Sequence, residues 1–360
     1  MRRLPESLRS GLTGRRVFFM LRGWPGLGRV MQGYALSQVL ATLAPQQRQF
    51  FFSSAAGFAF LREQDRMVFD TRTHEPFVSW FGALGHHCAH EIMAQVVEQR
   101  PSAIVVDGEL GLLGVVRAVY NGPVLALANP FDLDNPSHTP LFRAALRALH
   151  LSCDAVICAS FQRVSKSLSP LPLRTISVVP PLVRHEVIAQ PWSPTGTSAC
   201  VVLGGGSYAD SAMRDNLAVS LAAVIDVASV ITHLRFFIYG VCEDQAPSAP
   251  SNVSFCFDRT TCLQRMVSAT FLIARPGRNT IAEALVLGIP TVLLLGSTSG
   301  VRSSEQQANA SHAIATGLSA SIWTPGSKTP LLDHCLRLLS AFPTSPHWKP
   351  GNDAINRMLA

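Results

Sequence analysis

The chain has 360 residues, which is long for a single hydrophobic core and natural for two domains. With 48% hydrophobic and 15% charged residues, its composition excludes an intrinsically disordered chain. The formal net charge of +7 suits an anionic ligand or a lipid surface, whereas nucleic acid is the least favoured partner because no nucleic-acid motif is visible.

The cysteines and the first residues bear on location. The eight cysteines form no CxxC pair and no zinc-type spacing with histidine, so we expect reduced core residues of a cytoplasmic protein. Residues 1–14 are rich in arginine, and the apolar run 17–21 that follows is too short for a signal sequence or a membrane span. We therefore expect 1–14 to be a flexible basic leader, either solvated or lying on anionic lipid.

Apolar strands and periodic helices alternate over residues 15–189, which is typical of an α/β domain with a parallel sheet. The first strand, 16–22, runs into a loop that contains Gly26 and Gly28, and a helix is predicted over 30–43. The other predicted strands are 49–53, 67–69, 103–106, 123–128, one that ends at Ala159, and 177–181, with helices at 85–100, 112–120 and 141–150.

Three histidines, His86, His87 and His90, lie near the start of the predicted helix 85–100. His86 and His90 share a helix face, so they are either a metal pair or residues that face solvent. A histidine here is also a candidate acid–base residue, because a neutral imidazole is available near pH 7.

Two carboxylates, Asp107 and Glu109, directly follow the buried strand 103–106. In an open α/β sheet the carboxyl end of a strand lies at the ligand-binding edge, so these residues are candidates for catalysis. The alternative is that Asp107 caps the helix that follows.

A stretch rich in proline, glycine, serine and threonine, 190–198, is predicted to link the first domain to a second one over 199–345. The strand 199–203 ends in a glycine run whose backbone can approach a phosphate or a sugar, at Gly205, Gly206 and Ser207. Further elements are expected at 211–228, 235–239, 252–257, 260–267, 331–339 and 352–358. The tail, 346–360, is expected to cross back to the first domain.

The stretch 269–310 has the densest pattern. A strand over 269–274 ends in a Pro-Gly turn, and a helix is predicted to begin near Asn279 or Thr280 and to end at Gly288. A helix N-terminus suits a phosphate, and Glu283 in the first turn suits sugar hydroxyls. After a strand at 291–295, the polar residues Glu305, Gln306 and Asn309 are expected in a loop. The alternative is a plain βαβ unit with a capped helix and a polar loop.

This stretch resembles the nucleotide-sugar motif of GT-B glycosyltransferases, and in particular family 28 and related UDP-sugar hydrolases. The family pattern T-x-x-E-A-L-x-x-G-x-P is followed by E-Q-x-x-N-A. The matching residues are Thr280, Glu283, Ala284, Leu285, Gly288, Pro290, Glu305, Gln306, Asn309 and Ala310.

The resemblance implies roles for these residues. The turn at Gly277, Arg278, Asn279 and Thr280 would hold a diphosphate, and Arg278 would either add charge there or face solvent. Glu283 would bind the ribose, and the pair Glu305 and Gln306, with Asn309 beside it, would meet the donor sugar. The run Gly205, Gly206 and Ser207 resembles the opening of the family's second domain.

The first glycine loop resembles the family's G-x-G-H-x-x-R opening, which faces the cleft, but departs from it twice. Arg29 stands where the family has a histidine often assigned as catalytic, and Gln32 stands where it has an arginine. A guanidinium cannot act as a base near neutral pH, so either the base lies elsewhere or Arg29 binds a phosphate or an acidic acceptor. Asp107, Glu109 and His86 are the candidates for the base.

These patterns together predict an α/β protein with two Rossmann-like domains that face each other across a cleft, the GT-B fold. The resemblance implies metal-independent transfer of a sugar, UDP-linked by expectation, to a small-molecule, glycan or lipid-linked acceptor, with no cofactor. A UDP-sugar hydrolase, an epimerase and a non-catalytic nucleotide-sugar-binding protein remain open as well. The expected location is the cytoplasm, with peripheral contact at the inner face of the membrane as an option.

Overall fold

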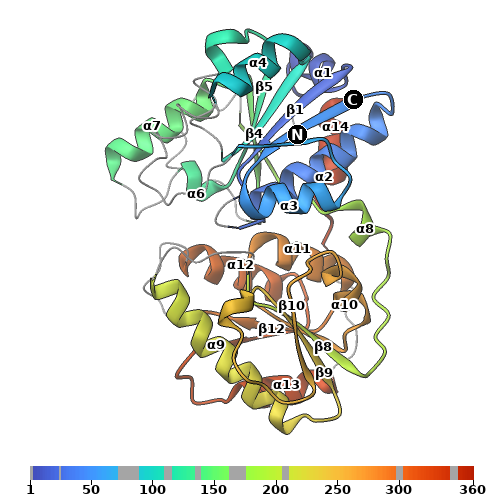
Figure 1. Ribbon diagram of the computed structural model, residues 1–360, viewed down its shortest axis with the longest axis vertical. Helices are drawn as coiled ribbons and strands as arrows, with labels where there is room; N and C mark the ends of the chain where they lie inside the picture. Colours follow the sequence, from blue (N-terminus) through green and yellow to red (C-terminus); the bar gives the residue numbers. More distant parts are fainter. Residues whose placement is uncertain are drawn as a thin grey trace. The chain divides into compact units, whose positions relative to one another are not determined.

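The computed structural model describes residues 3–23, 26–71, 89–108, 116–133, 139–161, 176–204, 211–296, 303–340 and 348–360. The chain forms two compact units, Met1–Arg184 with Pro350–Ala360, and His185–Lys349. Each unit is built around one sheet with helices packed on it (Figure 1).

The first unit contains a parallel sheet of seven strands in the order β3-β2-β1-β4-β5-β6-β7. This order, in which the chain moves outward from β1 and then restarts beside it at β4, is that of a Rossmann-like sheet. The strands are β1 (Arg16–Leu21), β2 (Arg48–Ser53), β3 (Val68–Asp70), β4 (Ala103–Asp107), β5 (Val124–Ala128), β6 (Ala155–Ala159) and β7 (Ile176–Val179).

Helices cover both faces of this sheet, which explains why its central strands are apolar throughout. Along β1, Val17 and Phe19 face the core beneath α2, whereas Phe18 and Met20 face the core on the other side. The helices of this unit are α1 (Glu6–Leu12), α2 (Gly28–Leu43), α3 (Ala55–Glu63), α4 (Ala89–Gln99), α6 (Pro130–Leu133), α7 (Pro140–Leu151) and α14 (Asn352–Leu359).

The expected flexible leader is wrong for most of its length, because residues 6–12 form α1. Leu8 and Leu12, four positions apart, lie on one side of α1, and both are buried in the first core together with Leu4, which precedes the helix. The backbone N–H of Leu4 also donates to the carbonyl of Met358, at 3.2 Å. Burial of this apolar stripe outweighs the polar character that the arginines give to the segment.

The last helix, α14, belongs to the first unit although it ends the chain. It packs against α2, as the red and blue helices of Figure 1 show. Ile355 and Met358 are fully buried there. The side-chain amide of Asn352 donates to the carbonyl of Val183 at 2.8 Å and accepts from its N–H at 3.0 Å, which fixes the end of the first unit's long segment.

The second unit contains a parallel sheet of six strands in the order β10-β9-β8-β11-β12-β13, again Rossmann-like. Its strands are β8 (Ser198–Val202), β9 (Arg235–Tyr239), β10 (Val253–Cys256), β11 (Phe271–Ala274), β12 (Thr291–Leu294) and β13 (Ala320–Trp323). Its helices are α8 (His185–Ile188), α9 (Ser211–Val230), the 3-10 turn η2 (Glu243–Gln245), α10 (Cys262–Ser268), α11 (Arg278–Leu287), α12 (Ser303–Ala315) and α13 (Leu331–Leu339). The predicted fold class, with two Rossmann-like α/β domains, is confirmed.

The boundary between the units falls at Arg184, five positions before the predicted end of the first domain at residue 189. Helix α8 packs against α11 and therefore belongs to the second unit. The predicted linker 190–198 is also attached to that unit, because Trp192 Nε1 donates to the carbonyl of Ala269 at 2.8 Å. The backbone N–H of Ser193 donates to the carbonyl of Val267 at 3.0 Å.

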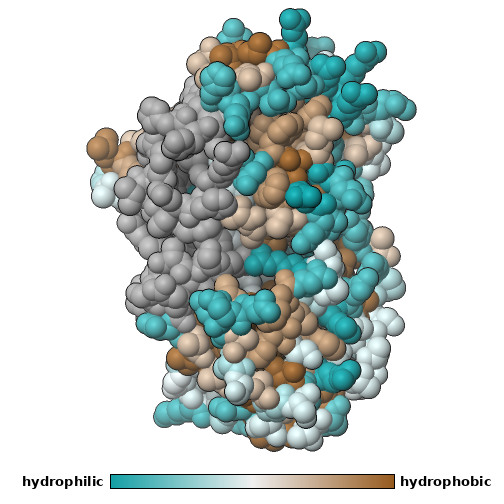
Figure 2. Space-filling model, in the orientation of Figure 1, coloured by the Kyte–Doolittle hydropathy of each residue, from teal (hydrophilic) through white to brown (hydrophobic). Residues whose placement is uncertain are grey.

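The described surface and the described cysteines bear on the predicted membrane contact and location. On the face drawn in Figure 2, hydrophobic areas of the described residues alternate with hydrophilic ones. Within the described ranges, no helix is both long and apolar enough to cross a membrane. The described cysteines are free thiols, and burial raises the pKa of Cys153 and of Cys335 to about 12, so neither is a reactive thiolate near neutral pH.

Replacement of Ile355 by alanine should destabilise the first unit, because it removes a fully buried side chain from the contact of α14 with the core. Core truncations of this kind cost about 2–5 kcal/mol of unfolding free energy. Chemical denaturation measures the loss, and Asn356→Ala, an exposed position on the same helix, is the control that should change little. Equal stability of the two variants would show that α14 does not contribute to the core.

Candidate functional site

In a Rossmann-like sheet, ligands bind outside the carboxyl ends of the strands, where neighbouring strands send the chain to opposite faces. In the first unit this switch point lies between β1 and β4, and in the second unit it lies between β8 and β11. The predicted site residues that the structure describes fall at or near these two edges.

In the second unit, a short turn leads from β11 into α11. Gly277 is the N-cap of α11, with an extended backbone and no side-chain capping bond, and the helix begins at Arg278. The helix therefore starts one to two residues before the predicted Asn279 or Thr280. At the other end, Gly288 adopts the left-handed conformation with φ of 67°, as the sequence predicted, and its N–H donates to the carbonyl of Ala284.

The turn presents positive charge at the carboxyl edge of the sheet. The N-terminus of α11 contributes the partial positive charge of its backbone N–H groups, and the half-buried Arg275 and Arg278 flank Gly277. A turn that binds a phosphate needs such N–H groups and a backbone that lets the phosphate come close. An alanine Cβ at position 277 would meet Thr280 Oγ1 only at 3.8 Å, so this edge of the turn is open.

Glu283 lies in the second turn of α11, not in the first as expected from the sequence. Only 8% of its surface is exposed, and its neighbours Ile281, Ala282 and Ala284 belong to the apolar core. Burial of a carboxylate is costly unless hydrogen bonds or cations compensate for it. Glu283 remains a candidate ligand for donor groups because of its place on a helix that begins at the switch point.

Glu305, Gln306 and Asn309 lie in helix α12 and not in a loop, which corrects the prediction for this segment. The segment consists mainly of good helix formers and contains neither glycine nor proline, and its polarity suggested a loop wrongly. The buried Asn309 donates from Nδ2 to the carbonyl of Pro276 at 3.1 Å. This hydrogen bond joins α12 to the turn before α11, so the two parts of the motif lie at one place.

Several predicted site residues lie outside the described residues. In the second unit these are Gly205, Gly206 and Ser207, which come after β8 and Gly204 in the sequence. The same holds for Glu109, His86 and His87 in the first unit, whereas His90 is an exposed residue of α4. Across the described ranges, no group of three or more histidines, cysteines and carboxylates is placed to hold a metal ion.

In the first unit, the switch point is occupied by an ion pair. Arg29, in the first turn of α2, donates from Nη1 to Oδ1 of Asp107, the last residue of β4, at 2.9 Å. The Asp107 side chain is 2% exposed and that of Arg29 is 16% exposed. The carboxylate is thus buried, whereas the Arg29 side chain is partly exposed.

Gly108 makes room for this pair. Its φ is +79°, which disfavours any residue with a Cβ. A Cβ there would lie 2.7 Å from Nε of Arg29 and closer still to its Cδ. The backbone N–H of Arg22 donates to the carbonyl of Asp107 at 3.0 Å, so the pairing of β1 with β4 continues up to this point.

Gln32, which stands at the family's arginine position, is buried and has a structural role. It donates from Nε2 to the carbonyl of Leu182 and accepts from the N–H of Leu182, both at 2.9 Å. These two hydrogen bonds hold α2 against Leu182, near the end of the segment Met1–Arg184. The exposed Gly28 begins α2, and Gly26 is half-buried in the loop before it.

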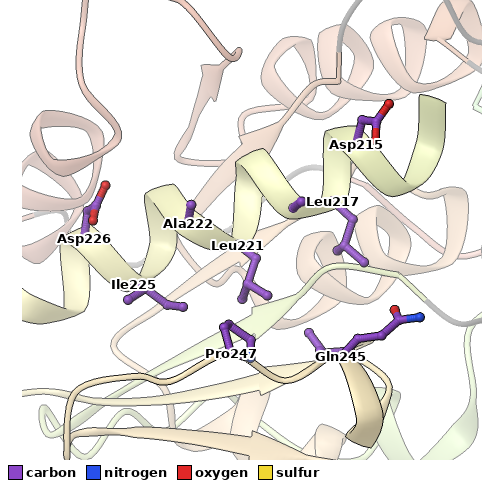
Figure 3. Close-up of a pocket in the computed structure, with 10 residues that line it drawn as sticks. Asp215, Leu217, Leu221, Ala222, Ile225, Asp226, Gln245 and Pro247 are labelled. Carbon is purple, nitrogen blue, oxygen red and sulfur yellow. The ribbon is translucent and has the colours of Figure 1, made fainter. Parts of the chain in front are cut away.

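A groove of about 540 Å³ lies between α9 and the segment after β9. Figure 3 shows Leu217, Leu221 and Ile225 pointing from α9 toward Pro247, whereas the carboxylates of Asp215 and Asp226 point away. The lining is mainly aliphatic, and none of the predicted site residues that the structure describes belongs to it. This groove is therefore poorly suited to a diphosphate.

Comparison with known proteins identifies the fold. No protein-family model and no curated protein matches the chain. Solved structures do match: the glycotransferase of kitacinnamycin has a TM-score of 0.60 at 14% identity, with 96% of this chain and 94% of that one covered. MurG of Acinetobacter baumannii has 0.51 at 16%, with 96% and 99% covered. UDP-GlcNAc 2-epimerase of Methanocaldococcus jannaschii has 0.59 at 11%, with 96% and 99% covered.

These identities are low, so the likeness establishes the fold and not the activity. The chain has the two-domain GT-B fold, as the resemblance of its motif predicted. The match extends over nearly the whole chain, and the similar structures include both glycosyltransferases and an epimerase.

Gly108→Ala should destabilise the protein more than Gly196→Ala, although both positions have positive φ. At Gly196 nothing lies within 4 Å of the added Cβ, so only the left-handed backbone is penalised, by about 1–2 kcal/mol. At Gly108 the Cβ also collides with Arg29, and overpacking adds about 1–3 kcal/mol. Denaturant unfolding of the two variants provides the comparison, and equal losses would contradict the close packing of Arg29 on Gly108.

Proposed function

We propose that this protein is a glycosyltransferase that moves a sugar from a nucleoside-diphosphate sugar, UDP-linked by preference, to an acceptor without the help of a metal. The donor binds to the second unit and the acceptor to the first. The observation that carries this proposal is the hydrogen bond from Asn309 to Pro276, which brings the two halves of the motif together at the N-terminus of α11.

The second unit supplies the groups that a departing diphosphate needs. The N–H groups at the start of α11 and the cations of Arg275 and Arg278 would stabilise the negative charge that develops as the sugar leaves. Glu283 would accept hydrogen bonds from ribose hydroxyls, and Glu305 and Gln306 would contact the donor sugar. Gly205, Gly206 and Ser207 are proposed to complete this site from the end of β8.

A base that deprotonates the acceptor hydroxyl would come from the first unit. Among the candidates from the sequence, Asp107 forms an ion pair with Arg29. This ion pair favours a role for Asp107 other than proton transfer. Glu109 and His86 are then the remaining proposals for the base.

A second function is supported by a specific likeness, since one similar structure is a UDP-GlcNAc 2-epimerase. Incubation of the purified chain with a panel of UDP- and dTDP-sugars, with and without candidate acceptors, distinguishes transfer from epimerisation, from hydrolysis of the donor and from binding without catalysis. Acceptor-dependent UDP release supports transfer. UDP release without acceptor indicates hydrolysis, an altered sugar indicates epimerisation, and tight binding without turnover indicates a binding protein.

Glu283→Gln should weaken UDP binding about 10- to 100-fold, because a neutral amide loses the charge-assisted hydrogen bonds to the ribose. Isothermal titration calorimetry measures the affinity, and a thermal melt checks that the variant is folded. Glu243→Gln, an exposed position in η2, is the control and should bind UDP normally. Unchanged affinity in folded Glu283→Gln would rule out the ribose role.

Turnover should persist in excess EDTA, because the N-terminus of α11 and its arginines provide positive charge where other enzymes place a metal. The assay compares initial rates of UDP release before and after chelation. Loss of activity that Mn²⁺ or Mg²⁺ restores would contradict a metal-independent mechanism.

A further inference from the structure

The switch point of the first unit brings together three charged side chains that the structure describes. Arg22 directly follows β1, Arg29 lies in the first turn of α2, and Asp107 ends β4. Among these three side chains two are cationic and one is anionic. The first turn of α2 contains no acidic residue, so the positive end of this 16-residue helix adds to the excess.

The position of Arg29 needs a physical reason. A cation in the first turn of a helix is opposed by the helix dipole, and the N-cap residue of α2, Leu27, makes no side-chain capping bond. Asp107 offsets this cost through the 2.9 Å ion pair, although a buried carboxylate is itself costly to maintain. The fold thus holds a guanidinium at the ligand-binding edge of the sheet, against its local electrostatic preference.

Arg29 is also held on a second side. Its side chain passes over Gly108, where any Cβ would displace it, while Asp107 engages its Nη1 atom. The guanidinium is therefore oriented before any ligand arrives, and the Arg29 side chain as a whole is 16% exposed. Such pre-orientation lowers the entropy lost when a planar, two-oxygen anion binds to arginine.

We propose that Arg29 binds an anionic group of the acceptor, a carboxylate or a phosphate, and that Asp107 is the residue that positions Arg29. The term acceptor rests on the proposed function, whereas the anion site itself does not. Arg29 acts here as a specificity residue for a charged substrate class. The carboxylate of Asp107 keeps the guanidinium in place through the 2.9 Å ion pair.

The test is a titration of the ¹⁵N-labelled full-length protein, saturated with UDP so that the turn before α11 is occupied. Inorganic phosphate and acetate are added separately and followed by nuclear magnetic resonance, through the side-chain Nε–H signal of Arg29 and through the backbone N–H signals of Gly28 and Gly108, which every variant keeps. The Nε–H signal is assigned by its absence in Arg29→Gln. The two anions distinguish a phosphate site from a carboxylate site, and binding of either one supports the proposal.

Arg29→Gln should weaken binding of the preferred anion about 10- to 100-fold, as expected for loss of a charge-assisted pair. Arg29→Lys keeps the charge but loses the planar fork, so it should weaken anion binding less. This variant replaces Arg29→Gln in the test if the glutamine variant is unfolded. Arg48→Gln, an exposed position at the opposite edge of the same sheet, controls for net charge and should bind normally. Absence of binding to the wild type, or equal losses in Arg29→Gln and Arg48→Gln, overturns the proposal.

The positioning role has its own readout. In Asp107→Asn the Nε–H signal of Arg29 should shift and its order parameter should fall, because the neutral amide holds the guanidinium less firmly. An unchanged signal overturns that role.

UDP affinity is measured in parallel: if UDP does not bind but anion binding depends on Arg29, the proposed function fails and the anion site stands. If UDP binds and the anion response is independent of Arg29, only the anion site fails.

Discussion

Parallel strand pairing is the constraint on which the rest of this structure depends. Every strand pair in both sheets is parallel, so all carboxyl ends within one sheet lie at a common edge. The strands themselves are buried between helices and must be apolar. Polar chemistry is consequently confined to the turns that leave this edge, and the Rossmann-like strand order places the most open turns beside β1 and β8.

The two units use this constraint differently. In the second unit, the positive charge comes from backbone N–H groups at the start of α11 together with Arg275 and Arg278, and Asn309 joins the turn to α12 by its hydrogen bond to Pro276. In the first unit, a side-chain ion pair occupies the edge, with Asp107 buried and Arg29 partly exposed. Because a guanidinium cannot give up its proton near neutral pH, Arg29 does not act as a base at this point.

Much of the fold could be predicted because the periodicity of buried residues is local. The alternation of apolar strands with helices fixed the number and order of most elements, and Gly288 marked a helix end through its backbone requirement. The stripe of Leu4, Leu8 and Leu12 was overlooked because nearby arginines suggested a solvated leader, although its four-residue spacing was visible. The polarity of residues 303–315 suggested a loop, whereas their helix propensity favours the helix α12 that is found.

Contacts between distant residues were beyond reach of such patterns. Arg29 and Asp107 are 78 positions apart, and Gln32 is 150 positions from Leu182. The sequence shows Gln32 at a position where the resembled family has an arginine. Only the fold shows that the Gln32 amide pairs with the backbone of Leu182. The depth of Glu283 was likewise hidden, since it depends on which face of α11 packs on the core.

The central claim, that the turn between β11 and α11 is the diphosphate site, is tested most directly by a crystal structure with UDP bound. The account predicts that the diphosphate accepts hydrogen bonds from backbone N–H groups of residues 278–280 and that the ribose lies at Glu283. Density for UDP elsewhere, for example in the groove beside α9, with this turn vacant at saturating UDP, would contradict it.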